Sequence, residues 1–402
     1  MSVDRIASRV RRIKPSPSTS AADRANELRR QGKRIVSLVV GEPDFDTPAH
    51  IRQAAARAME QGATRYTPMA GTLELRQAIA AKLQRENGLT YALDEIIATN
   101  GAKSAIFSAL AATIEPGDEV IIPAPYWVSY PDMVLACEGK PITIACGEEQ
   151  GFKLTAEQLA AAITPKTRWL IINSPANPTG ASYTKPEYRA LADVLALHPD
   201  VLVMTDDIYE HIRFDGQQTP HLLTAAPELR DRTLAINGVS KTYAMTGWRI
   251  GWVAGPRDLV KALDTLLSQS AGNCCSVSQA AAAAALNGDQ AFVAESVAIY
   301  RQRRDQAVAR INAIPGLRCP LPDGAFYLYV NCAGLIGRKT PQGKVLETDG
   351  DVVLHFLESA GVALVAGTAY GLSPYFRLSI ATSLEALHEG IDSMAGSVAD
   401  LR

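Results

Sequence analysis

The sequence predicts an α/β fold: a mostly parallel, seven-stranded sheet between helices, with a smaller α+β domain beside it. Three observations support this prediction. Short runs rich in Ile and Val alternate with helical segments through the middle of the chain. These runs show little apolar–polar alternation, which is typical of parallel strands buried on both faces. The chain has 402 residues, more than one hydrophobic core usually holds, so we expect two domains.

Seven segments have the length and composition of buried strands, and three of them are followed by a helical pattern. The predicted strands are residues 95–100, 119–123, 140–146, 168–173, 201–205, 233–237 and 249–255. Helices are predicted at residues 103–113, 154–163 and 187–197, and the alanine-rich run 279–286 is expected to be a buried helix.

The C-terminal third has a different pattern. A long polar helix is predicted first, and a mixed unit follows it: helix 292–314, strand 324–331, a surface loop at 337–351, helix 351–361, strands 362–367 and 375–381, and a closing helix. We therefore expect three parts: an N-terminal arm with part of the small domain (1–46), a large domain (47–288), and a linking helix with the small C-terminal domain (289–402).

Composition narrows the class of protein. A net charge of −2, with 47% hydrophobic and 20% charged residues, is ordinary for a soluble enzyme and argues against a nucleic-acid-binding protein. No apolar run is long enough to cross a membrane, and the N-terminus lacks the apolar core of a signal peptide. The six cysteines form no CxxC pair or metal-ligand pattern. We expect free thiols, no bound metal and a cytoplasmic location.

Polar residues and glycines follow four of the predicted strands. They are Gly101-Ala102-Lys103, Asn177, Asp206 with Tyr209, and Ser240 with Lys241. Each has a structural explanation when taken alone: Asp206 as a helix cap, Asn177 as a turn residue before proline, and Gly101 as a tight turn. Ligands of open parallel sheets bind outside the carboxyl ends of the strands. Their joint occurrence at strand ends therefore indicates a ligand site at one edge of the sheet.

Seven motifs, taken together, resemble the class I/II aminotransferases, which are pyridoxal-phosphate enzymes of fold type I. They occur in family order and span nearly the whole chain: GEPDFDTP (41–48), RYTPMAGTLELRQAIA (65–80), PYWVSY (125–130), NSPANPTG (173–180), DDIYEHIRF (206–214), SKTYAMTGWRIG (240–251) and YFRLSIATS (375–383). Within the family, the chain is similar to bacterial aspartate aminotransferases of the subgroup that carries a lysine at the position of Lys103. The resemblance implies pyridoxal 5′-phosphate as the cofactor of the 47–288 domain.

The resemblance assigns Lys241 as the residue that bonds the cofactor aldehyde. An amine attacks an aldehyde only when it is deprotonated, and the apolar stretch around Lys241 favours the neutral form. Ser240 and Arg249 resemble the family's phosphate-binding pair, and the Gly101-Ala102-Lys103 turn adds backbone N–H donors at a helix start. Tyr66 is implied to reach the same phosphate from a neighbouring subunit. A homodimer is therefore expected.

Further roles concern the cofactor ring. Asp206 is implied to face the pyridine nitrogen and keep it protonated, which makes the ring an electron sink. Asn177 and Tyr209 would donate hydrogen bonds to the phenolic oxygen. Trp127 would pack on the ring face, although a plain core aromatic remains an alternative for that residue. Lys241, Asp206 and Tyr209 are thus the expected catalytic residues.

The substrate would be held from both domains. Arg377 resembles the arginine that grips the α-carboxylate, and Gly41 would allow close backbone approach. Lys103 is expected to meet a distal carboxylate with the hydroxyls of Ser16 and Ser18 nearby; the alternatives are that it neutralises the phosphate or points to solvent. Trp127 and Asn177 are expected to contact the substrate as well. Because Arg377 and Gly41 lie outside the large domain, substrate should draw the domains together.

The reaction implied is a ping-pong transamination between the pyridoxal and pyridoxamine forms of the cofactor. It would move an amino group from L-aspartate, or another dicarboxylic amino acid, to 2-oxoglutarate, with Lys241 transferring the Cα proton. Three alternatives stay open. The first is a glutamate/aspartate–prephenate, aromatic or alanine aminotransferase, and the second is a β-lyase. The third, a regulator fused to a DNA-binding module, is disfavoured because the family arm begins almost at the first residue.

Overall fold

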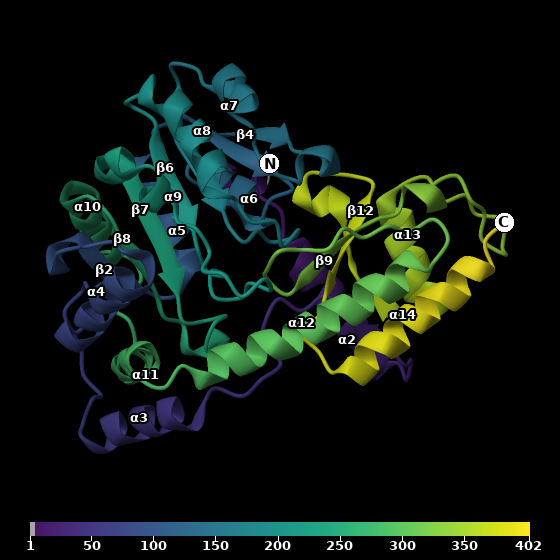
Figure 1. The fold of residues 1–402 in the computed structure, drawn as a ribbon, viewed down its shortest axis with the longest axis horizontal. Helices are drawn as coiled ribbons and strands as arrows, with labels where there is room; N and C mark the ends of the chain where they lie inside the picture. The colour runs from purple at the N-terminus through teal and green to yellow at the C-terminus, as the bar shows by residue number, and fades with distance from the viewer. Residues whose placement is uncertain (1–4) are drawn as a thin grey trace.

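The computed structural model describes residues 5–402, apart from the side chain of Ser18. Two bodies lie side by side in it, and the long helix α12 (Ala291–Asn312) spans both (Figure 1). The larger body contains a seven-stranded sheet, and the smaller one contains a three-stranded sheet.

The large sheet confirms the seven predicted strands. They are β2 (Ile96–Thr99), β3 (Glu119–Ala124), β4 (Lys140–Ala145), β5 (Thr167–Asn173), β6 (Leu202–Asp206), β7 (Thr233–Gly238) and β8 (Gly251–Ala254). The strand order is β2-β8-β7-β6-β5-β3-β4, and only β8 runs antiparallel to its neighbours. The first residue of β8 therefore lies at the same edge as the last residues of the other strands, since Gly251 pairs with both Thr99 and Gly238.

Helices cover both faces of this sheet because successive strand side chains point in opposite directions. Ile96, Ile172 and Val203 belong to one buried cluster, and Ile97 and Ile171 belong to another. Helices on the first face are α3 (Ala49–Glu60), α4 (Leu73–Asn87), α7 (Ala156–Ala162), α8 (Lys185–Ala196), α9 (Leu222–Ala225) and α11 (Ser276–Asn287). Helices on the second face are α5 (Ala102–Thr113), α6 (Ser129–Ala136) and α10 (Arg257–Ser268).

Two predicted strands differ from expectation. β4 is not buried on both faces: it lies at the sheet edge, pairs only with β3, and its residues are exposed or half-buried. The strand predicted from Arg249 begins at Gly251, because Arg249 has a φ of 57° and is in the left-handed region, which a strand cannot contain.

The smaller body is built around β9 (Tyr327–Asn331), β11 (Val365–Ala366) and β12 (Tyr375–Ser379), all antiparallel. Its helices are α13 (Asp349–His355), which continues as a π-helical turn, and α14 (Leu384–Ala399). The single strand predicted at 362–367 is wrong. It is two strands in different sheets, since β10 (Val362–Ala363) pairs in parallel with β1 (Val36–Ser37) from the N-terminal segment.

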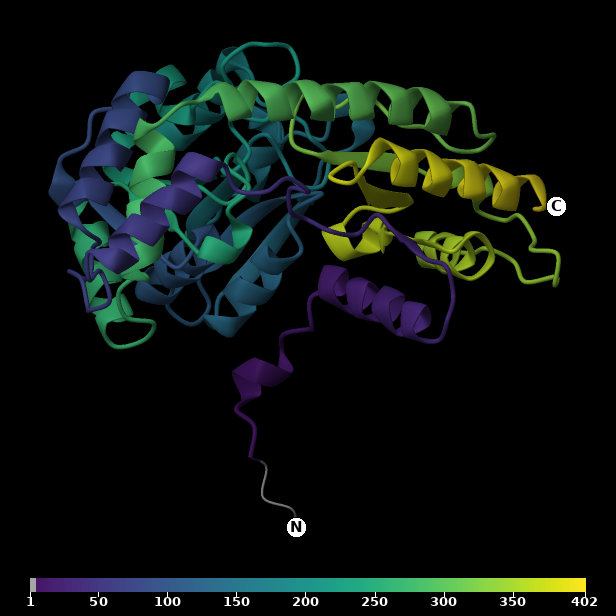
Figure 2. The same cartoon turned by 90° about the horizontal axis from the view of Figure 1, so that it is seen from below.

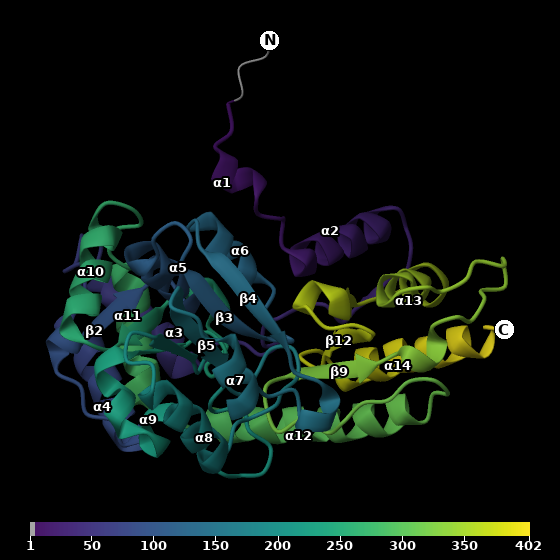
Figure 3. The same cartoon turned by 90° about the horizontal axis from the view of Figure 1, so that it is seen from above.

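The N-terminal segment approaches the smaller body through α2 (Pro17–Arg30), whose Ala25 and Leu28 pack in one cluster with Tyr329 and Val365. The short helix α1 (Ser8–Arg11) projects from the rest of the chain in two views (Figures 2 and 3), but it lies near α6 of the larger body, where Arg12 forms an ion pair with Glu138 at 3.0 Å. Within residues 5–402, no helix combines the length and apolar character that a membrane span requires.

Candidate active site

A cavity of about 340 Å³ opens at the edge of the sheet where β6 and β7 end and β8 begins. It receives side chains from the large sheet, the smaller body and the N-terminal segment. Its lining residues are Ser16, Gly41, Ala102, Lys103, Ile106, Trp127, Val128, Ser129, Asn173, Asn177, Asp206, Ile208, Tyr209, Ser240, Lys241, Arg249, Tyr327 and Arg377. Of the predicted site residues whose side chains the structure describes, all except Gly101 and Tyr66 are in this set.

Asp206, the last residue of β6, is a buried carboxylate on the cavity wall. Its Oδ2 accepts a hydrogen bond from the Tyr130 hydroxyl at 2.6 Å, and Oδ1 accepts one from the Ile208 N–H at 3.4 Å. Burial raises the pKa of Asp206 to about 6, although the bond from Tyr130 opposes the rise. Sequence reasoning missed Tyr130, which lies in the first turn of α6 and whose backbone N–H donates to the Trp127 carbonyl at 3.0 Å.

Lys241 follows β7 in a turn and is half-buried. Its Nζ donates a hydrogen bond to the carbonyl of Gly41 at 2.6 Å, which brings the N-terminal segment to the lysine. Burial lowers the pKa of Lys241 to about 8, against the opposing charge of Glu42. An appreciable fraction of the amine is therefore neutral near pH 8, as a nucleophilic amine requires.

Arg377, in β12, is a buried cation with a free donor. Nη1 donates to Asn177 Oδ1 at 3.1 Å and Nη2 to the Val39 carbonyl at 2.6 Å. The buried Nε has no hydrogen-bond partner within the described residues. Buried charges are normally paired, so this guanidinium is suited to a carboxylate ligand.

A positive corner lies where α5 begins. Gly101 is the N-cap of this helix with a φ of 87°, and a Cβ there would stand 2.5 Å from Arg249 Nη2. Gly101 thus permits both the turn and the approach of Arg249, although it does not itself line the cavity. Arg249 donates to the carbonyls of Thr246 and Asn100 at 2.8 and 3.2 Å. With Ser240 and the first N–H groups of α5, it forms a corner that fits a phosphate.

The mouth of the cavity is more exposed. The Lys103 ammonium lies 4.9 Å from the centroid of the Trp127 ring, and partial burial together with the charge of Arg249 lowers the pKa of Lys103. Ser16 lines the cavity nearby, whereas the Ser18 side chain is outside the described part of the chain. Tyr66 is 97% exposed and does not line the cavity of its own chain.

Among the lining residues that were not predicted, Asn173 and Tyr327 hydrogen-bond to predicted site residues. Asn173 accepts a hydrogen bond from the Asn177 N–H and donates one to the Asp206 carbonyl, both at 2.8 Å, so it fixes the turn between them. Tyr327 places its hydroxyl 2.9 Å from that of Tyr209. Asn173 belongs to the NSPANPTG motif, but Tyr327 stands in an apolar strand and carries no sequence signal of its own.

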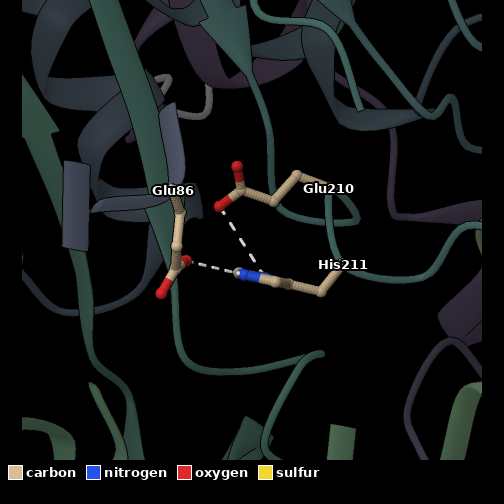
Figure 4. Close-up of side chains that lie close together, drawn as sticks. All are labelled: Glu86, Glu210 and His211. Atoms are coloured by element: carbon tan, nitrogen blue, oxygen red, sulfur yellow. Dashed lines mark hydrogen bonds and ion pairs between the residues drawn. The ribbon is translucent and has the colours of Figure 1, made fainter. Parts of the chain in front are cut away.

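A charged cluster lies next to Tyr209 in sequence, formed by Glu86, Glu210 and His211 (Figure 4). Its ligand-type atoms lie within 4.8 Å of one another, as in some metal sites. The ammonium of the buried Lys82, however, already forms ion pairs with both carboxylates. Burial would raise the pKa of Glu210, but the charge of Lys82 prevails and lowers it to about 2. We therefore assign the cluster as an ionic network.

This network connects two of the segments that line the cavity. His211 Nδ1 lies 3.1 Å from the hydroxyl of Thr242, the residue after Lys241. Glu210 is adjacent to Tyr209 and also accepts a hydrogen bond from Asn237 at 2.5 Å. The segments that carry Tyr209 and Lys241 are thus anchored to one another.

The cavity therefore combines a lysine with a lowered pKa, a buried carboxylate, a positive corner for a phosphate and a second buried cation. On a sheet of this topology, these features define a pyridoxal-phosphate-dependent enzyme. The particular family follows from sequence. The family described as aminotransferase class I and II matches residues 33–394, and the chain belongs to it. The protein is a pyridoxal-phosphate-dependent aminotransferase.

Individual relatives agree with this assignment. An aspartate aminotransferase of Rhizobium meliloti (strain 1021) is 51% identical over 391 residues, which is 97% of this chain and 95% of the relative. An aspartate/prephenate aminotransferase of Cereibacter sphaeroides is 50% identical over 378 residues, 94% of each chain.

Solved structures show the same likeness. The crystal structure of the Rhizobium meliloti aspartate aminotransferase superposes with a TM-score of 0.97 at 50% identity, with both chains fully covered. The Thermus thermophilus aspartate aminotransferase with maleate has a TM-score of 0.92 at 39% identity, covering 98% of this chain and 100% of that one.

Proposed function

We propose that this aminotransferase moves the amino group of L-aspartate, or of another dicarboxylic amino acid, to 2-oxoglutarate in a ping-pong reaction. The observation that carries this proposal is a pair of cations on two walls of one cavity. Arg377 projects from the smaller body, and Lys103 projects from the start of α5. A dicarboxylate has an anionic group for each. The relatives named aspartate aminotransferase, and the Thermus structure with the dicarboxylate maleate, support the same choice.

The proposed roles follow the geometry of the cavity. Lys241 bonds the cofactor and then carries the proton from the substrate Cα, because its pKa of about 8 lets the amine act as base and acid near neutral pH. The cofactor, when bound, supplies a ring that withdraws electrons from Cα. Asp206 would hold the ring nitrogen, and Asn177 and Tyr209 would hold the phenolic oxygen. Trp127 would pack on the ring face, and Ser240, Arg249, Gly101, Ala102 and the backbone of Lys103 would surround the phosphate, while the side chain of Lys103 is left for the substrate.

We further propose a homodimer in which Tyr66 reaches the phosphate corner of the partner. The support is its exposure together with a fixed backbone: the fully buried Gln279 bonds both Thr67 and Thr72, on either side of the loop that follows Tyr66. Hybrid dimers of one Tyr66→Phe subunit and one Lys241→Ala subunit would test this. If Tyr66 crosses the interface, one site of the hybrid keeps both groups and the other lacks both; if it does not, each site lacks one group.

The parts 1–46, 47–288 and 289–402 remain our proposed division of the chain, with closure of the smaller body over the cavity when substrate binds. A cytoplasmic location is proposed on the six cysteines, all of which are free thiols.

The second candidate is an aspartate/prephenate aminotransferase, favoured by the relative of that name from Cereibacter sphaeroides. A half-reaction screen tests both. Purified holoenzyme is mixed with each amino acid, and the absorbance change to the pyridoxamine form is followed; the product is then mixed with oxaloacetate, 2-oxoglutarate, prephenate or an aromatic oxo acid. Rapid conversion by aspartate and glutamate is expected. Conversion by aromatic amino acids alone, or release of pyruvate and a thiol from a cysteine conjugate, would contradict the proposal.

A further inference from the structure

Tyr327 lies where the two bodies meet at the cavity. It is the first residue of β9, is 1% exposed and lines the cavity. Its hydroxyl is 2.9 Å from the Tyr209 hydroxyl, on the large body. Its ring lies 4.4 Å from the guanidinium carbon of Arg377. A Cβ on Gly41 would come within 2.8 Å of the same hydroxyl, so the N-terminal segment also packs against it. One side chain thus contacts three cavity residues that come from three parts of the chain.

The pair of hydroxyls constrains the direction of hydrogen bonding. Each phenol has one hydrogen, so only one of the two can donate within the pair. In the proposed function Tyr209 gives its hydrogen to the phenolic oxygen of the cofactor. Tyr327 must then donate to Tyr209. A hydroxyl that accepts a hydrogen bond becomes a stronger donor, because the two bonds polarise one another.

The ring of Tyr327 has a separate role. The guanidinium carbon of Arg377 lies over this ring and over that of Tyr370, at 4.4 and 5.2 Å from the two ring centroids. Planar guanidinium groups stack favourably on aromatic faces. The two rings therefore restrict the plane in which Arg377 can present its donors to a carboxylate.

We infer that Tyr327 is a positioning residue that acts through two partners: its hydroxyl directs and strengthens the hydrogen bond that Tyr209 donates, and its ring orients Arg377. The inference rests on the roles proposed above for Tyr209 and Arg377. It links the smaller body, which grips the substrate, to the cofactor side of the large body through one residue.

Tyr327→Phe separates the two roles, because it removes the hydroxyl and keeps the ring. The absorbance of the resting holoenzyme should change with pH. The midpoint of that change reports how tightly a proton is held at the bond between Lys241 and the cofactor. Without the bond from Tyr327, Tyr209 donates less strongly and the phenolic oxygen keeps more negative charge, which holds that proton more tightly. The midpoint should therefore rise by a fraction of the about 0.4 to 1 pH unit that corresponds to one whole neutral hydrogen bond, because the bond from Tyr209 is weakened and not lost. The KM values for aspartate and alanine should stay within about twofold, since the contact with Arg377 is retained.

Three further variants act as controls. Tyr329→Phe changes a buried tyrosine of the same strand whose hydroxyl bonds the Leu372 carbonyl at 2.7 Å and which does not line the cavity, so the midpoint should not move. In a Tyr209→Phe background, Tyr327→Phe should add no shift, since the group through which it acts is gone. Tyr327→Leu also removes the ring and should raise KM for aspartate and alanine alike.

An unchanged midpoint in Tyr327→Phe, with cofactor bound normally, would overturn the inference. A full shift that persists in the Tyr209→Phe background would do the same, because Tyr327 would then act by another route. Failure of the proposed function looks different: wild-type holoenzyme would show no conversion by aspartate or glutamate in the half-reaction screen, whatever the midpoint of the Tyr327 variants.

Discussion

The cavity has an inner and an outer end, and the two are built differently. The inner end consists of Asn177, Asp206, Tyr209, Lys241 and Arg377. The outer end consists of Ser16, Lys103 and Trp127, with Tyr66 beyond it. Asp206 is 5% exposed and Arg377 2%, whereas Tyr66 is 97% exposed. Inner groups also hydrogen-bond to protein groups within the cavity, as Asp206 does with Tyr130 and Arg377 with Asn177. The outer lysine, Lys103, instead lies 4.9 Å from the centroid of the Trp127 ring and is close enough to feel the charge of Arg249.

In the proposed function, the inner end carries out the reaction and the outer end selects the substrate. A buried charge is costly unless partners hold it in place, so the inner groups are fixed before any substrate arrives. In the proposed function they contact the parts that every α-amino acid shares. The outer groups are free to meet whatever side chain a substrate carries. Changes at the inner end should therefore be large and independent of substrate, and changes at the outer end smaller and dependent on it.

The largest effect is expected for Lys241→Ala. The phosphate corner is intact, so cofactor should still bind, but the base that moves the Cα proton is missing. Turnover should fall with every amino acid, by at least the roughly 10²–10⁴-fold that a general acid–base group contributes. Steady-state rates and bound cofactor after gel filtration measure this, with Lys261→Ala on the exposed face of α10 as the control. Turnover close to wild type would remove Lys241 from its role.

Asp206→Ala is expected to come next. Without the carboxylate the ring nitrogen loses its proton, so removal of the Cα proton should slow by about 10²–10³-fold, as when other preorganised electrostatic groups are removed. A primary isotope effect with Cα-deuterated substrate should increase, since this step then limits the rate. An unchanged single-turnover rate would refute the role of Asp206 and the contrast between the two ends.

The buried carboxylate of Asp206 at the inner end should also lower the free energy of unfolding. Burial raises the pKa of Asp206 from 3.8 to about 6, so the folded protein binds this proton more tightly than the unfolded chain. The contribution of Asp206 to stability therefore falls as pH rises from about 3.8 to 6, and the penalty is complete above pH 6. In cofactor-free protein, Asp206→Asn should raise the free energy of unfolding by about 3 kcal/mol at pH 7.5 and by about half as much at pH 5. Urea unfolding at the two pH values measures this; an equal gain at both would contradict it.

Sequence reasoning located the strands well and the contacts between side chains poorly. Seven apolar runs identified β2–β8; for all of these strands except the edge strand β4, burial on both faces leaves a clear composition signal. The motifs brought together the residues at strand ends. Tyr327 was missed because its partner Tyr209 is 118 positions away, and a tyrosine in an apolar strand resembles a core residue. The left-handed conformation of Arg249, and the division of 362–367 between two sheets, depend on tertiary contacts that no local pattern encodes.

The smallest effect, and the most selective one, is expected for Lys103→Ala at the outer end. In the proposed function Arg377 holds the α-carboxylate of any amino acid, so it would not distinguish among them. Lys103 is placed to meet a second carboxylate, and a charged hydrogen bond contributes about 1.5–3 kcal/mol. The kcat/KM for aspartate and glutamate should fall by about one to two decades.

Alanine has no second carboxylate, so its kcat/KM should stay nearly unchanged in Lys103→Ala. Measuring both substrates in one variant separates the two roles open to this lysine, because a contact with the cofactor phosphate would affect them equally. Lys103→Arg keeps the charge and should retain part of the preference for aspartate. Equal losses for aspartate and alanine would place Lys103 with the cofactor-binding groups, and selection of dicarboxylates would then have to come from elsewhere in the cavity.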